Sequence, residues 1–171
     1  DEMQVAGFPF KAEWFAAQPW IDRERMVAGG GSYGGYLTTL ILGREHPFKA
    51  LVAHAKVYNL YTQYAADFSA TVPRFGGFWE EGNREVVERN SPHLGAGNFD
   101  TPTLVIHGQR DQRVPVNHGL ELYQTLLIKG VPTRFVYFPD ENHWVLKPQN
   151  SLFWYAQVQR WFQEHGGADA P

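Results

Sequence analysis

Residues 26–42 read MVAGGGSYGGYLTTLIL and predict a buried strand that turns directly into a helix. The apolar run 26–30 ends in glycine, and apolar side chains recur at helical spacing within Ser32–Leu42, before a glycine that stops the helix. The junction, residues 30–34, matches G-x-S-x-G. A serine on so sharp a turn has a strained backbone, so we expect the glycines at 30, 34 and 35 to prevent collisions there.

The pentapeptide has two interpretations. In one, Ser32 is a nucleophile, and the backbone amide of Tyr33, at the start of the helix, stabilises an oxyanion. In the other, the serine hydroxyl only caps the helix. The strand before the motif and the helix after it favour the nucleophile.

Strands and helices alternate along the rest of the chain. We expect strands over 49–54, 103–107 and 133–138, and helices near 84–89, over 117–129 and over about 150–164. The strand at 103–107 is apolar throughout, as a strand buried on both faces should be. This order predicts a three-layer α/β fold with a mostly parallel sheet of about four strands.

A serine nucleophile needs a base, and the base needs an acid that orients it. At the edge where parallel strands end, the expected chain order is serine, acid, histidine. Asp111 follows the strand 103–107, and His143 follows the strand 133–138. We therefore predict a triad of Ser32, Asp111 and His143.

Other candidates fit less well. Asp140 and Glu141 are too close in sequence to His143 to orient it. His107 lies at a strand end, where local packing or bonding is expected, although it stays open as an alternative base. The remaining histidines do not follow strands in the required order, so they are expected to be structural or exposed; they are His46, His54, His93, His118 and His165.

The composition excludes several other functions. The chain has no cysteine, which rules out disulfides, zinc thiolates and a cysteine nucleophile. Its net charge is −3 and basic residues are scattered, so neither nucleic acid nor a membrane surface is an expected partner. No apolar stretch approaches the roughly 18–20 residues that span a bilayer. No histidine or acidic pair has metal-ligand spacing, so we expect no metal and no cofactor. The compartment stays open.

Three segments in this order resemble the prolyl oligopeptidase family of serine peptidases, in particular its acylaminoacyl-peptidase and dipeptidyl-peptidase 5 branch. They are GGSYGGY (30–36), HGQRDQRVP (107–115) and YFPDENH (137–143), and the likeness runs from about Gln18 to His165. The resemblance implies an α/β-hydrolase fold and hydrolysis of short peptides through an acyl-enzyme.

The resemblance also implies roles in substrate binding. Tyr58 and Tyr61 would line the pocket for the residue before the scissile bond, and Val114 would touch the same side chain. Arg113 would bind the carbonyl of the next residue back, a role that suits a guanidinium beside the acid loop. Core packing for the tyrosines and a surface ion pair for Arg113 stay open as alternatives.

The chain also departs from the family pattern. Members carry an N-terminal β-propeller and, before the serine motif, further strands and a loop that supplies a second oxyanion donor; none of these is recognisable here. We therefore expect residues 1–171 to be a partial catalytic domain. Either an N-terminal region or a partner chain would cover the apolar edge of the strand 26–30, and self-association stays open. Two other functions remain: an esterase for small esters, and a non-catalytic binding or assembly module.

Overall fold

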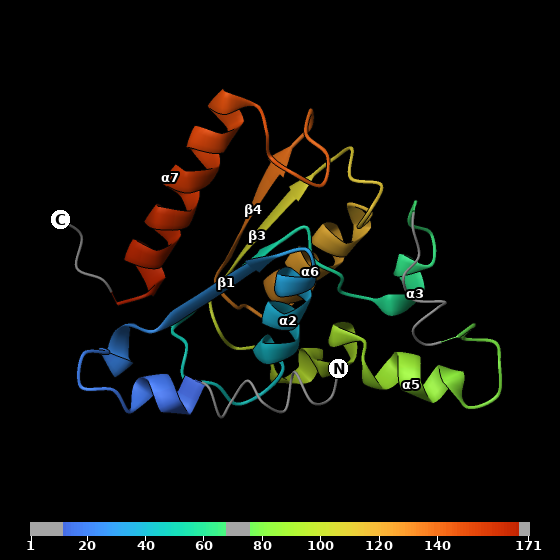
Figure 1. The fold of residues 1–171 in the computed structure, drawn as a ribbon, viewed down its shortest axis with the longest axis horizontal. Coiled ribbons are helices and arrows are strands. Elements are labelled where there is room, and N and C mark those ends of the chain that lie inside the picture. Colours follow the sequence, from blue (N-terminus) through green and yellow to red (C-terminus); the bar gives the residue numbers. More distant parts are fainter. Residues whose placement is uncertain (1–11, 68–75, 168–171) are drawn as a thin grey trace.

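A parallel sheet of four strands forms the centre of the protein (Figure 1). The computed structural model describes residues 12–67 and 76–167. The strands are β1 (Val27–Gly31), β2 (Ala50–His54), β3 (Thr103–Gly108) and β4 (Thr133–Phe138), and they pair in the order β1-β2-β3-β4. Every neighbouring pair is parallel, which confirms the expected sheet. Among the described residues β1 is an outer strand, with β2 as its neighbour on one side.

The long helices lie close to their predicted positions. They are α2 (Tyr33–Leu42), α6 (Asn117–Ile128) and α7 (Pro148–His165). The segment between β2 and β3 holds shorter elements, namely α3 (Leu60–Gln63), α5 (Asn83–Arg89) and the 3-10 helix η2 (Pro92–Asn98). A further 3-10 helix, η1 (Arg23–Arg25), precedes β1. No helix in the described part of the chain is both long and apolar enough to cross a membrane.

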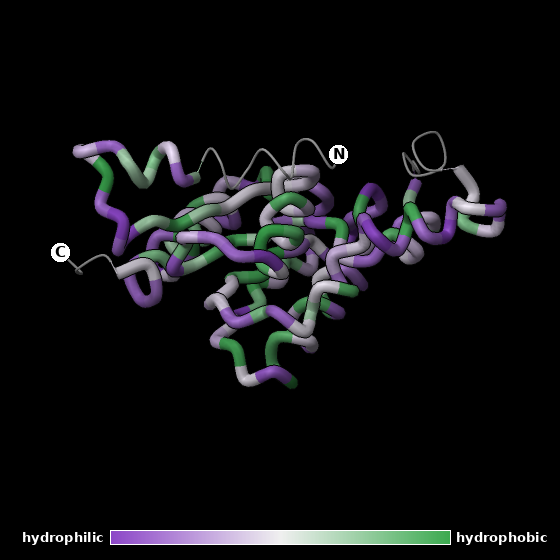
Figure 2. The backbone as a smooth tube through the Cα atoms, turned by 90° about the horizontal axis from the view of Figure 1, so that it is seen from below, coloured by the Kyte–Doolittle hydropathy of each residue, from purple (hydrophilic) through white to green (hydrophobic). Residues whose placement is uncertain are grey.

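Helices cover both faces of the sheet (Figure 1). On one face, Leu51, Ala53 and Val105 pack in a core cluster with side chains of α2 and α6. On the other face, alternate strand residues pack against Trp161 of α7. Successive strand side chains point to opposite faces of the sheet, and helices cover both faces. The strands β2 and β3 are therefore buried along their whole length. Figure 2 shows hydrophobic segments running through the middle of the molecule. This is the predicted three-layer architecture.

The parallel topology brings three loops to one edge of the sheet. β1, β3 and β4 end at Gly31, Gly108 and Phe138, and the loops after them carry the predicted serine, acid and histidine. Parallel strands that end at the same edge therefore position the residues of the candidate site.

Candidate active site

Ser32 lies on a strained turn between β1 and α2. Its φ angle is 56° and its ψ angle is −120°, a backbone conformation that is uncommon for any residue but glycine. The turn is held by hydrogen bonds from the Ser32 amide to the His54 carbonyl (3.0 Å) and from the Tyr36 amide to the Ser32 carbonyl (2.9 Å). The Ser32 side chain makes no capping hydrogen bond to the helix, so the capping interpretation does not apply.

Two glycines allow the turn to close. A Cβ on Gly30 would lie 2.9 Å from the Gly34 Cα, and one on Gly35 would lie 2.6 Å from the His54 carbonyl oxygen. The expectation for Gly34 was wrong, because a Cβ there would meet nothing within 4 Å. A side chain at position 30 would collide with the backbone of Gly34. The turn therefore requires a glycine at position 30 and not at position 34.

The structure brings the predicted serine, histidine and acid together. The Ser32 Oγ lies 2.9 Å from Nε2 of His143, and Nδ1 of the same ring lies 2.8 Å from Oδ2 of Asp111. Both distances are hydrogen-bond lengths. The His143 side chain is 12% exposed, so the ring can be reached from solvent while its far side rests on a buried acid. This geometry can move a proton from the hydroxyl to the imidazole.

Asp111 is buried, and both of its carboxylate oxygens have hydrogen-bond partners. Its Oδ1 accepts the backbone N–H groups of Arg113 (2.9 Å) and Val114 (2.8 Å). Its Oδ2 faces His143 and, at 3.4 Å, His107 Nε2. Burial alone would raise the pKa of Asp111, but the hydrogen bonds from His107, His143 and Val114 outweigh burial and hold this pKa well below its ordinary value. The acid is therefore ionised at neutral pH.

His107 is not placed to act as the base. Its ring is fully buried, and its Nε2 lies 2.8 Å from the Val114 carbonyl oxygen, so the ring bonds locally as the sequence predicted. Burial lowers the pKa of His107. The ring helps to hold the acid loop and stays neutral.

Three basic side chains are buried in the interior, two of them histidines that were expected to be structural or exposed. His54, Lys56 and His118 are each at least nine-tenths buried. Burial, and then the charges of neighbouring basic groups, lowers the pKa of His54 to about 4 and that of His118 to about 3. Burial also lowers the pKa of Lys56. The charge of Asp111 opposes the lowering of the pKa of His54 and His118 but does not offset burial, so both histidines are neutral at neutral pH.

The residues expected to bind substrate are dispersed. Tyr58 is 3% exposed, packs in the core cluster shared by α2 and α6, and donates its hydroxyl to Thr125 Oγ1 at 3.0 Å. That position corresponds to the alternative of core packing. Tyr58 also borders a surface hollow along α6, with His93 and Gln124, and this hollow contains no member of the triad. Val114 is also buried, and its backbone amide bonds the acid.

Tyr61 and Arg113 lie nearer the surface. Tyr61 borders a hollow with Phe78 and Trp79, and its hydroxyl donates to Glu88 Oε1 at 3.0 Å. The Arg113 side chain is half-exposed and donates its Nε–H to Asp67 at 2.8 Å. An ion pair of this kind was the alternative for Arg113, although it leaves the guanidinium on the acid loop.

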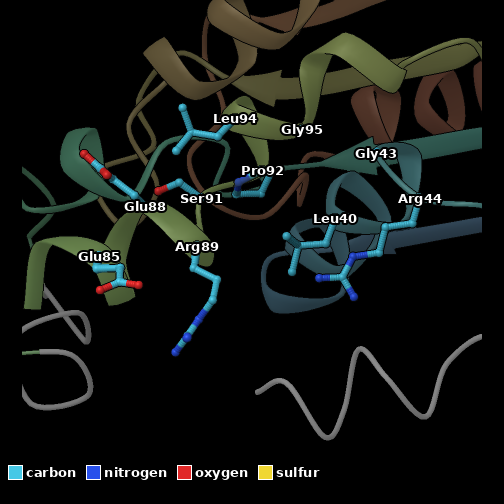
Figure 3. A pocket seen from close by; sticks show the side chains of 10 residues that line it. All are labelled: Leu40, Gly43, Arg44, Glu85, Glu88, Arg89, Ser91, Pro92, Leu94 and Gly95. Atoms are coloured by element: carbon cyan, nitrogen blue, oxygen red, sulfur yellow. The ribbon is translucent and has the colours of Figure 1, made fainter.

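A further hollow contains no triad member. It lies where α2 ends beside α5 and η2 and includes Arg44, Glu85 and Arg89 (Figure 3). In the described part of the chain, no group of three or more histidine or acidic side chains is arranged to hold a metal ion.

Comparison with known proteins shows the family of this chain. The family model described as "Prolyl oligopeptidase family" matches residues 5–169. The chain belongs to the prolyl oligopeptidase family. The family likeness inferred from the three segments is thereby confirmed.

Individual relatives of this family member are peptidases by name. Dipeptidyl-peptidase 5 of Schizosaccharomyces pombe is 43% identical over 149 residues, which cover 83% of this chain and 21% of the relative. A probable dipeptidyl-peptidase 5 of Aspergillus clavatus is 40% identical over 157 residues, with coverages of 88% and 21%. The uncomplexed acylaminoacyl peptidase of Pyrococcus horikoshii superposes with a TM-score of 0.81 at 25% identity, covering 92% of this chain and 27% of that one. The chain thus spans about a fifth to a quarter of the length of these proteins.

Proposed function

We propose that this chain carries the catalytic residues of a serine peptidase that hydrolyses short peptides through an acyl-enzyme. The observation that carries the proposal is the pair of short contacts on one imidazole, 2.9 Å to the Ser32 hydroxyl and 2.8 Å to the Asp111 carboxylate. Membership of the prolyl oligopeptidase family supports the same chemistry.

Each residue has one role in the proposed reaction. His143 Nε2 takes the hydroxyl proton as Ser32 Oγ attacks the carbonyl carbon of the peptide bond. The Tyr33 amide, at the N-terminus of α2, stabilises the oxyanion that forms. The imidazolium then gives its proton to the leaving amine, and the C–N bond breaks. Asp111 stabilises that imidazolium and fixes the ring tautomer.

Water completes the cycle. His143 takes a proton from a water molecule, and the resulting hydroxide attacks the acyl carbon. The bond from that carbon to Ser32 Oγ then breaks, and the serine oxygen recovers the proton from the imidazolium. No step in this sequence uses a metal or an organic cofactor.

The substrate is proposed from the relatives' names and from two surface side chains. The relatives are called dipeptidyl-peptidases and acylaminoacyl peptidases, which favours short peptides. Arg113 stands on the acid loop, two residues after Asp111, where its guanidinium can donate to a peptide carbonyl. Tyr61 borders an aromatic hollow that suits an apolar side chain.

Turnover of matched substrates tests the proposal. The full gene product that contains residues 1–171 is assayed with dipeptide anilides, N-acylated aminoacyl anilides and nitrophenyl esters, alongside Ser32→Ala. We expect anilide hydrolysis that Ser32→Ala abolishes. Ester hydrolysis without anilide hydrolysis would identify an esterase, and a folded protein inactive on every substrate would identify a non-catalytic module.

A further inference from the structure

Glu141 occupies an unusual position for a carboxylate close to the active site. It lies two residues before His143, yet its carboxylate bonds residues 146, 147 and 150. The residue is only 5% exposed, although carboxylates are rarely buried without partners. The reaction proposed above gives it no task.

The carboxylate closes the loop that carries His143. Oε2 of Glu141 accepts the Leu146 amide at 3.2 Å, and Oε1 accepts the Lys147 amide at 3.0 Å. Oε1 also accepts the side-chain amide of Asn150 at 2.7 Å. Burial would raise the pKa of Glu141, but these hydrogen bonds outweigh burial and lower it, so the side chain is charged at neutral pH.

The same contacts tie the loop to the start of α7. Lys147 is the N-cap residue of that helix and has no capping hydrogen bond from its own side chain. The Glu141 carboxylate therefore satisfies an amide at the helix N-terminus, where a negative charge is favoured by the helix dipole. One end of the histidine loop is thus fixed to an 18-residue helix.

The backbone of Glu141 fixes the loop on its other side. Its carbonyl oxygen accepts the Arg110 amide at 2.9 Å, a bond to the loop that carries Asp111. A Cβ on Gly108 would lie 2.6 Å from that carbonyl oxygen, so the two loops meet where only a glycine fits. Acid loop, histidine loop and α7 are all joined at Glu141.

We propose that Glu141 is a positioning residue, which holds His143 between Ser32 and Asp111 by anchoring its loop to α7 and to the acid loop. The inference rests on the function proposed above. It adds that the alignment of the base depends on a carboxylate that touches neither substrate nor reacting atoms. An error of about 1 Å in such an alignment can cost about 100-fold in rate.

The substitution Glu141→Gln tests the proposal in the full gene product. A glutamine keeps the size of the side chain but presents an NH₂ group to donors, so at least one of the three bonds is lost. We expect kcat for peptide anilides to fall about 10–100-fold with KM unchanged within about twofold. Backbone amides at 144–147 should exchange their hydrogens faster. The control Asp140→Asn removes the neighbouring charge, which pairs with the exposed side chain of Lys147 and accepts a hydrogen bond from Asn150. It leaves the three bonds of the Glu141 carboxylate in place and should keep the wild-type kcat.

The outcomes separate this inference from the proposed function. Wild-type kcat together with unchanged exchange in a folded Glu141→Gln protein would overturn the positioning role. If the wild type hydrolyses nothing, the peptidase proposal fails, while faster exchange in Glu141→Gln still supports the anchoring of the loop. If Glu141→Gln does not fold, Asn150→Ala removes one of the three bonds to the Glu141 carboxylate, together with the bond from Asn150 to Asp140, and leaves the carboxylate itself. A kcat lowered about 3–10-fold supports the inference and a wild-type kcat contradicts it.

Discussion

The Cα of Gly34 lies where a side chain at Gly30 would have to stand, because a Cβ on Gly30 would be 2.9 Å from it and closer still to the Gly34 carbonyl group. This close approach lets β1 turn into α2 within one residue and leaves Ser32 at its positive φ. The nucleophile's position thus depends on a missing side chain two residues earlier.

The substitution Gly30→Ala should therefore displace the serine. We expect the free energy of unfolding to fall by about 1–3 kcal/mol, the range for forced overpacking, and hydrolysis to drop at least tenfold. Gly34→Ala is the matched control, since a Cβ there meets nothing within 4 Å, and it should keep both properties. Denaturant unfolding and anilide turnover measure the two effects. Equal behaviour of the two variants would count against the steric argument.

Asp111→Asn should remove the orienting charge while keeping the side chain's size. An amide in this position favours the wrong tautomer of His143 and cannot stabilise an imidazolium, so kcat should fall about 10⁴-fold. The exposed residue Asp100, substituted to Asn, is the control and should leave kcat unchanged. Steady-state kinetics on a peptide anilide decide the matter, and a loss smaller than tenfold would argue against Asp111 as the acid.

His118→Asn should change how stability depends on pH. The pKa of His118 is lowered to about 3 by burial and then by the charges of Lys56 and His107, whereas an unfolded histidine titrates near 6.5. Between these values the unfolded chain binds more protons, so the free energy of unfolding falls as pH drops from about 6.5. Asparagine can still accept the amides of Tyr58 and Asn59, which His118 Nδ1 accepts at 3.1 and 3.3 Å.

The slope of the unfolding free energy against pH reports how many more protons the unfolded chain binds than the folded one. Between pH 6.5 and 4 we expect this number to be smaller in His118→Asn than in the wild type, by up to about one proton. Chemical denaturation at a series of pH values gives this slope. An unchanged slope would mean that His118 is not held neutral in the folded protein.

Lys56→Met should stabilise the protein. The Lys56 side chain is fully buried, and its Nζ has no hydrogen-bond partner among the residues that the structure describes. Replacing this buried, unpaired amine with an apolar side chain should raise the free energy of unfolding by about 1–3 kcal/mol at pH 7. Burial lowers the pKa of Lys56, so the wild type gains stability as pH rises toward the ordinary lysine value, and the advantage of Lys56→Met should shrink with it. A destabilised Lys56→Met protein would indicate that the amine has a favourable role.

The sequence predicted the sheet because its strands are short apolar runs between glycine-rich or polar segments. The strand 133–138 was predicted at its observed bounds, and the helix expected over 150–164 occupies Pro148–His165. The proximity of Asp111 and His143 to Ser32 was predicted for the same reason, since each follows a strand that ends at the edge where Ser32 lies. Glu141 was correctly excluded as the orienting acid, because it bonds its own loop and α7.

Other features depended on tertiary contacts that no local pattern reveals. Tyr58 fits a pocket or a core equally well by its chemistry, and only the packing around Thr125 places it in the core. His118 was expected to be structural or exposed, and only the tertiary structure shows it buried, with Nδ1 accepting the amides of Tyr58 and Asn59. The 3-10 helix η2 contains one proline and two glycines in seven residues and has no helical period.

Labelling with a fluorophosphonate probe, followed by peptide mapping of the modified residue, tests the central claim most directly. The proton path from Ser32 to His143 predicts rapid modification of Ser32 alone in the wild-type gene product. It also predicts labelling at least 1,000-fold slower in His143→Ala, the scale on which triad members act. Equal labelling rates in the two proteins, or a folded wild type whose Ser32 stays unmodified, would contradict the account.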